Sequence, residues 1–147
     1  MSQHPPVMPF DDSSRAGVYP LPQGGLADLR SAAEQQGLAL FYIDLAGITS
    51  KDRFLAAVAQ ALGFPDWFGR NWDALEDCLT DMSWQPAGGY VLILAHADDF
   101  HMADEDSFAL ALRILQTAAE FWREDGIPFW ALVDLRSSGT AVLPELP

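Results

Sequence analysis

The stretch FPDWFGRNWDALED (residues 64–77) joins a predicted turn to a predicted helix. Its proline and Gly69 are turn formers, and Asn71 is a favoured residue at the cap that begins a helix. Asp73 and Asp77 are four residues apart, which places both carboxylates on one face of that helix. The combination of a turn with a pair of like charges indicates a surface that binds a cationic partner.

The surrounding sequence alternates between predicted helices and apolar strands. Helical spacing and capping residues predict helices at 26–36, 49–62, 71–80 and 98–102, and a longer helix from Asp106 or Ser107 to Gly126. Apolar runs typical of strands buried on both faces occur at 38–45, 90–95 and 129–135. Strands of this type that alternate with helices pair in parallel. We therefore expect an α/β fold of two layers, with a three-stranded parallel sheet covered by helices.

The chain is expected to divide into one main domain and three smaller segments. Its length of 147 residues suits a single domain with its own core. The predicted segments are a flexible N-terminal leader at 1–25, an extra helix at 26–37, the main domain at 38–135 and a C-terminal tail at 136–147.

The negative charge of the chain is concentrated in one window of the sequence. The net charge is −13, which disfavours direct binding to the phosphate backbone of a nucleic acid. Ten Asp and Glu residues lie between Asp66 and Asp106, where Arg70 is the one Lys or Arg. A role in solubility alone would spread the charge more evenly, so the window favours an acidic face that binds a basic protein.

The cysteine and histidine residues do not predict a catalytic or metal site. Cys78 is the single cysteine, so it forms no internal disulfide, and we expect it to be a small buried side chain. His96 and His101 are five residues apart, which separates them on a helix, so we interpret the polar residues around them as a loop after a strand. No metal ion or cofactor is predicted. The absence of a signal peptide or an apolar run of membrane-spanning length favours a cytoplasmic location.

The aromatic residues of the turn are expected to divide between the core and the surface. Phe64, Phe68 and Trp72 have the spacing of inward-facing side chains. Trp67 lies at the tip of the turn, and we expect it to be exposed, as tryptophans beside acids are in many protein interfaces. Arg70 is placed to pair with a neighbouring carboxylate, at Asp66 or Asp73.

Three other interpretations of Asp73 and Asp77 are open. The pair can be an ordinary solvated helix face, although the nearby Glu76 and Asp81 add repulsion that a structural helix would offset with a Lys or Arg. A metal site needs more ligands than two carboxylates on one helix. A catalytic carboxylate pair needs a deep cleft, which a domain this small does not favour, and we therefore expect no enzyme activity.

Residues 62–80 resemble the barstar family, the intracellular inhibitors of barnase-type ribonucleases. The pattern is Pro-acid-aromatic-aromatic-Gly-x-Asn-x-Asp-Ala-Leu-x-Asp, and the order of strands and helices also matches from about residue 38 to 135. The resemblance implies a small α/β domain with a three-stranded parallel sheet. It implies a basic ribonuclease as partner, blocked by the acidic helix and the turn before it.

The resemblance also implies which residues bind the partner. The aspartate that enters the ribonuclease active site, where the RNA phosphate would lie, corresponds to Asp77. The remaining contact residues are Trp67, Gly69, Asn71, Asp73, Glu76 and Thr80.

Three positions depart from the family pattern. Trp67 and Glu76 stand where the family's best-known member has a tyrosine and a tryptophan. The counterpart of an acidic contact on the later helix is open between Glu120 and a register that places Phe121 there. An alternative function is therefore an immunity or antitoxin-type module for a different basic toxin.

Overall fold

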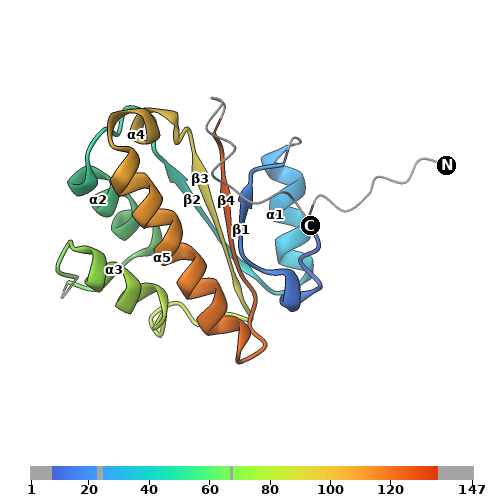
Figure 1. Ribbon diagram of the computed structural model, residues 1–147. Coiled ribbons are helices and arrows are strands. Elements are labelled where there is room, and N and C mark those ends of the chain that lie inside the picture. Colours follow the sequence, from blue (N-terminus) through green and yellow to red (C-terminus); the bar gives the residue numbers. More distant parts are fainter. Residues whose placement is uncertain (1–7, 23–24, 67, 136–147) are drawn as a thin grey trace.

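A four-stranded parallel sheet forms the centre of the protein, with its strands in the order β1-β4-β3-β2 (Figure 1). The computed structural model describes residues 8–22, 25–66 and 68–135. The strands are β1 (Val18–Pro20), β2 (Ala39–Asp44), β3 (Tyr90–Ala95) and β4 (Phe129–Val133). The helices are a 3-10 turn, η1 (Ser13–Arg15), and α1 (Leu26–Gln35), α2 (Lys51–Leu62), α3 (Trp72–Leu79), α4 (Asp98–Ala103) and α5 (Glu105–Arg123).

The parallel α/β prediction is confirmed, but the sheet has four strands rather than three. The additional strand β1 lies in the segment predicted to be a leader, and it pairs with β4 through Val18–Ala131, Tyr19–Leu132 and Pro20–Val133. A segment this short, ending in a proline, has no strand pattern of its own. It is stable here because it extends an existing sheet, at an edge where Pro20 needs no further ladder partner.

The strands differ in burial according to their place in the sheet. Every residue of β3 and β4 is buried, as predicted. The prediction that β2 is buried on both faces is wrong, because β2 is the other edge strand. Tyr42 of β2 is 41% exposed, and Asp44 at its end is also exposed. The apolar run at 38–45 does not distinguish an edge strand from a central one.

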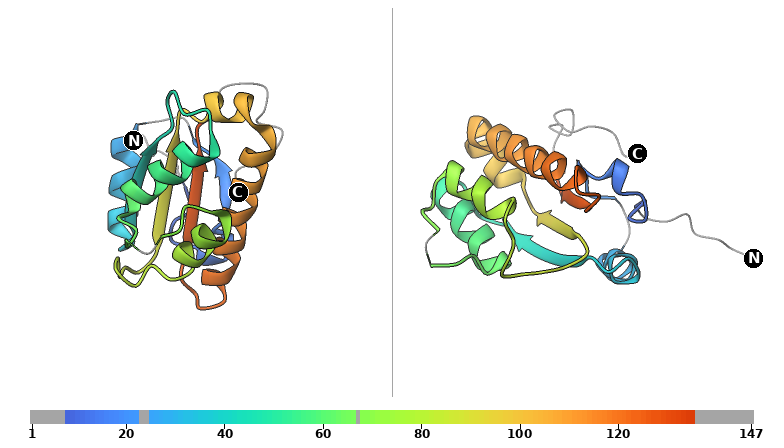
Figure 2. Two further views of the ribbon diagram at one scale, coloured as in Figure 1. Left: turned by 90° about the vertical axis from the view of Figure 1, so that its left-hand side faces the viewer. Right: turned by 90° about the horizontal axis from the view of Figure 1, so that it is seen from below.

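Helices cover both faces of the sheet (Figure 2). Within residues 38–135 all the helices lie on one face, as the two-layer prediction requires, and their apolar sides meet Leu92, Leu94 and Ala131 in the larger core cluster. The opposite face presents Val91, Ile93, Trp130 and Leu132. This second core cluster is completed by α1 and the first described residues, which contribute Met8, Phe10, Leu29 and Ala33. The predicted extra helix therefore adds a third layer.

Local signals set most helix ends. The Ser50 hydroxyl accepts the Arg53 N–H at the start of α2, and Gly63 ends the helix in the left-handed conformation, with φ +66°. The predicted caps for α5 are wrong. The Asp104 carboxylate accepts the Ser107 N–H at 3.0 Å, so α5 begins at Glu105, directly after α4. Asp104, Asp106 and Ser107 are all residue types that cap helices, and contact with α4 decides among them.

No helix within the described parts of the chain has both the length and the apolar character needed to span a membrane.

We expect α1 to contribute substantially to stability because it covers an otherwise apolar sheet face. Replacing Leu29, which is 2% exposed, by Ala should lower the free energy of unfolding by about 2–5 kcal/mol, measured by urea denaturation. The matched control is Leu26→Ala on the same helix, where the side chain is 38% exposed and the loss should be much smaller. Equal effects of the two substitutions would show that α1 does not depend on burial for its attachment.

Candidate functional site

The predicted contact residues that the structure describes lie on the turn before α3, on α3 itself and, for Thr80, at the cap that ends the helix. Asn71 begins the helix as predicted, since its side-chain oxygen accepts the Ala74 N–H at 2.7 Å. Its amide group also donates to the Gly69 carbonyl at 3.4 Å, which connects the turn to the first helical turn. One asparagine side chain therefore both starts the helix and holds the turn against it.

The two faces of α3 have opposite character. Leu75, Cys78 and Leu79 are buried against the core. Asp73, Glu76 and Asp77 are exposed on the outer side, together with Asp81 after the helix end. Thr80 is half-buried, and its hydroxyl donates to the Glu76 carbonyl at 2.8 Å. The burial of the apolar face thus orients the carboxylates outward as one group.

Tertiary contacts hold α3 at both ends. The Trp122 indole of α5 donates to the Leu79 carbonyl at 2.8 Å, which satisfies a backbone oxygen at the end of the helix. At the other end the Trp72 ring lies 6.1 Å from the Phe54 ring, and the Lys51 ammonium lies 5.7 Å from the Trp72 centroid. A helix of eight residues is marginal by itself, so these contacts are needed to keep it formed.

The aromatic residues of the turn form a half-buried cluster. The Phe64 ring packs edge-on against Phe68 at 4.9 Å and against Trp84 at 5.7 Å. Trp84 also donates its indole N–H to the Leu62 carbonyl. The predicted inward packing of Phe64, Phe68 and Trp72 is therefore only partial, because all three also retain accessible surface. Trp67 lies outside the described residues, so its exposure stays a prediction.

The carboxylates of α3 have no basic partner within the described parts of the chain. The predicted pairing of Arg70 with Asp66 or Asp73 does not occur among these residues, where the Asp44 carboxylate lies 2.9 Å from the His96 ring. The negative field extends inward to the Cys78 thiol. Burial, and then the neighbouring Asp77 and Asp81 charges, raise the pKa of Cys78 to about 11, so the thiol is protonated at neutral pH. This agrees with the prediction of a structural cysteine.

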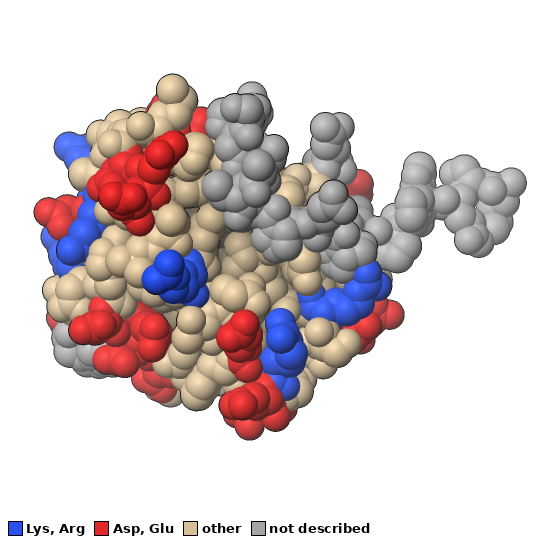
Figure 3. Space-filling model, viewed as in Figure 1, with Lys and Arg blue, Asp and Glu red and all other residues tan. Residues whose placement is uncertain are grey.

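The acidic window of the sequence does not form a single patch. Figure 3 shows one group of acidic side chains over α3 and a separate group over the start of α5. Two acids of the second region have structural roles, since Asp104 caps α5 and Asp99 accepts the Gly47 N–H at 2.9 Å. The group on α3 is therefore separate from the second group, in which two of the acids already serve the fold.

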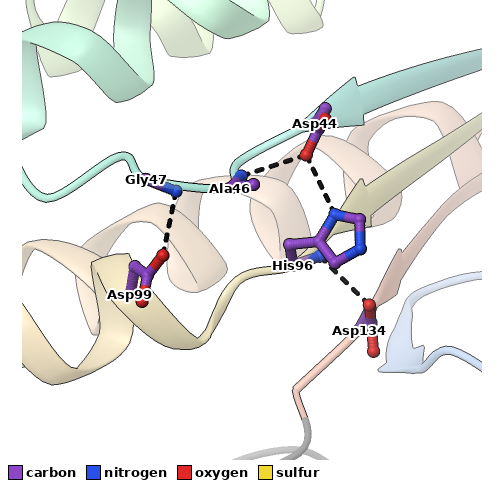
Figure 4. A network of polar contacts seen from close by, with 6 residues as sticks. All are labelled: Asp44, Ala46, Gly47, His96, Asp99 and Asp134. Atoms are coloured by element: carbon purple, nitrogen blue, oxygen red, sulfur yellow. Dashed lines mark hydrogen bonds and ion pairs between the residues drawn. The ribbon is translucent and has the colours of Figure 1, made fainter.

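A separate polar network joins the carboxyl ends of three strands (Figure 4). The Asp44 carboxylate lies 2.9 Å from the His96 ring nitrogen and accepts the Ala46 N–H, while Asp134 accepts the His96 backbone N–H at 3.1 Å. The Ala46 hydrogen bond first, and His96 second, lower the pKa of Asp44. These contacts connect the ends of β2, β3 and β4.

Within the described residues the strand-end network is not arranged as a metal site, although it contains His and Asp side chains. The His101 ring lies apart from His96 and packs against Phe108 at 4.9 Å. Within the described residues no group of three or more His, Cys, Asp or Glu side chains is placed to bind a metal ion. His96, with φ +56°, instead serves the turn that follows β3.

The two candidates for the later-helix contact, Glu120 and Phe121, have different surroundings on α5. The Phe121 side chain is 44% exposed and contacts the Trp122 ring, whose indole is bonded to α3. Glu120 instead accepts a hydrogen bond from Gln116, whose own side-chain oxygen accepts the Val18 N–H. Glu120 is therefore on the flank of α5 that faces β1. The sequence did not show which of the two residues, Glu120 or Phe121, lies on the flank of α5 that faces β1, because both fall outside the centre of the apolar stripe of α5.

Comparison with known families identifies the main domain. The family model described as Barstar (barnase inhibitor) matches residues 38–134. The match begins at β2 and ends just after β4, so it includes the turn and α3 and leaves out β1 and α1. A comparison with curated proteins found no match.

The cap at Asn71 predicts a measurable stability effect. Asn71→Ala removes the side-chain acceptor for the Ala74 N–H and should lower the free energy of unfolding by about 1 kcal/mol. Asn71→Ser is the matched control, because serine can accept the same hydrogen bond, and it should retain most of the stability. Chemical denaturation of the three proteins measures the difference. A serine variant as unstable as the alanine variant would contradict the capping role.

Proposed function

The chain belongs to the barstar family, and we propose that it inhibits a barnase-like ribonuclease by covering the enzyme's active site with the turn and α3. The proposed contact residues are Trp67, Gly69, Asn71, Asp73, Glu76, Asp77 and Thr80. The protein acts as an inhibitor rather than as an enzyme, and it needs no cofactor. A cytoplasmic location is part of the proposal, since there the inhibitor would protect cellular RNA.

The observation that carries this proposal is the group of uncompensated carboxylates on the outer face of α3. A ribonuclease active site collects Arg, Lys and His side chains to hold phosphate groups. A set of carboxylates that is held in place on one helix face is the electrostatic complement of such a basic site. In this arrangement Asp77, at the middle of the exposed face, occupies the place of an RNA phosphate.

The attachment of α3 supports tight binding because it reduces the ordering that association requires. The Asn71 cap, the Trp122 hydrogen bond to Leu79 and the contact of Trp72 with Phe54 hold the helix before any partner arrives. A preorganised surface loses less conformational entropy on binding than a mobile one. The like charges on α3 repel one another in the free protein, and a basic partner would remove that repulsion.

A different basic toxin is the second candidate partner. Glu76 is exposed at a proposed contact position and adds a carboxylate where the family's best-known member has an aromatic residue. The extra charge suits a partner with more cations at its rim. In that case the protein is an immunity module with the same acidic helix and a different target.

Asp77→Ala tests the assigned mechanism. Hydrogen bonds to charged groups contribute about 1.5–3 kcal/mol each, so the loss of this carboxylate should weaken inhibition of a barnase-type ribonuclease by roughly 10- to 100-fold. Titration of RNA cleavage against inhibitor concentration measures the change. The control is Glu34→Ala, which removes an exposed carboxylate from α1 on the opposite face of the sheet. Unchanged inhibition by a folded Asp77→Ala protein would refute the mechanism.

The association rate should depend strongly on salt if the α3 carboxylates attract the partner. The Debye length falls from about 30 Å at 0.01 M salt to about 3 Å at 1 M, so long-range attraction is lost over this range. We expect the association rate constant to fall by at least about tenfold, with a smaller change in the dissociation rate constant. Stopped-flow mixing over a salt series measures both. A salt-independent association rate would argue against electrostatic attraction.

A further inference from the structure

Arg70 is a cation within the turn that carries part of the proposed contact surface. It is exposed, and it lies directly between Gly69 and Asn71, two of the proposed contact residues. Its backbone adopts the left-handed conformation, with φ +52°, which fixes the direction in which the side chain leaves the turn. No ion pair of Arg70 is formed within residues 8–22, 25–66 and 68–135.

A groove runs beside Arg70, between α2 and the turn. It has a volume of about 410 Å³. The α2 side is lined by Ala56, Ala59 and Gln60, and the turn side by Phe64, Pro65, Asp66 and Phe68. Arg70 also lines this groove. The groove thus combines apolar side chains with the charged residues Asp66 and Arg70, which form no ion pair with each other, and it borders the turn that carries Gly69 and Asn71.

Binding at Gly69 and Asn71 has a consequence for the arginine between them. A partner that covers both neighbours removes water from the Arg70 guanidinium, and an ion that loses its water without gaining a partner is strongly unfavourable. A cationic group of the ribonuclease at this place would add repulsion between like charges. An anionic group there would remove both problems, and a carboxylate matches the planar guanidinium in a two-bond arrangement.

We propose that Arg70 and the adjacent groove bind a carboxylate-bearing segment of the partner, next to the basic site that α3 covers. This inference rests on the proposed function, and it makes Arg70 a specificity determinant. The α3 carboxylates recognise the cations common to ribonuclease active sites. Arg70 selects, among such enzymes, those that carry an acid beside an apolar side chain at the rim.

The decisive variant is Arg70→Glu, because two explanations predict opposite signs. If only the overall field matters, replacing a cation by an anion should strengthen binding to a basic enzyme. If Arg70 faces a carboxylate, the same change places two anions in contact, and the dissociation constant should rise by about tenfold or more. Binding is measured by surface plasmon resonance, with a barnase-type ribonuclease that the unaltered protein inhibits. Binding as tight as that of the unaltered protein, or tighter, would overturn the inference.

Arg30→Glu is the matched control. Arg30 is exposed on α1, on the face of the sheet opposite to α3, and the substitution changes the net charge equally. It should leave the dissociation constant within about twofold or lower it slightly, because only the screened long-range field changes. A loss of affinity as large as that of Arg70→Glu would overturn the inference, since the effect would then not be local.

Charge exchange on the ribonuclease identifies the group that Arg70 contacts. Each acidic residue of the enzyme is replaced in turn by arginine, and one such variant should restore the affinity of Arg70→Glu while weakening the unaltered inhibitor. Failure of every exchange would overturn the carboxylate assignment. The double variant Asp66→Arg with Arg70→Glu tests whether Arg70 pairs within its own chain. Restored affinity in that variant would assign the Arg70 partner to Asp66 and would overturn the inference.

The same measurements separate this inference from the proposed function. If Asp77→Ala weakens binding and Arg70→Glu does not, α3 covers the enzyme as proposed and Arg70 has no acidic partner. If the unaltered protein does not bind the ribonuclease, or Asp77→Ala has no effect, the proposed function fails and this inference fails with it.

Discussion

The two central strands, β3 and β4, are buried along their whole length, and this requires cover on both faces of the sheet. Side chains of consecutive strand residues point to opposite faces, so Leu92 and Leu94 need cover on one side while Val91 and Ile93 need it on the other. The helices of the family-matched region supply the first cover. The segment before that region supplies the second through α1, and its short strand β1 occupies the edge beside β4.

The acidic helix depends indirectly on the same constraint. The position of α5 follows from its packing on β4 and the rest of the sheet, and α5 in turn carries Trp122, whose indole holds the end of α3. The inner face of α3 is committed to the core through Leu75, Cys78 and Leu79. Its outer face is exposed and can carry charges whose mutual repulsion destabilises the helix slightly. The dipole at the helix N-terminus offsets part of this at Asp73, which lies in the first turn.

This division between an inner face for stability and an outer face for charge explains how the α3 carboxylates persist with no basic partner among the described residues. A buried arrangement of the same acids would require cations or hydrogen-bond donors beside them. On the exposed side the repulsion is screened by water and is small compared with the burial of the inner face. The helix can therefore keep a surface suited to a basic partner without losing its fold.

Local chemistry was sufficient to predict the strands β2, β3 and β4, most helices, the Asn71 cap, the end of α2 at Gly63 and the buried place of Cys78. These features depend on residues close together in the chain, where caps, turns and periodicity act directly. Strand order was beyond such reasoning, since β2 and β3 have similar apolar sequences, and only their neighbours make one an edge and the other central. The place of β1, the separation of the acids into two groups and the attachment of α3 to Trp122 also depend on contacts between segments far apart in the chain. Such contacts have no signature in the residues that make them until the chain has folded.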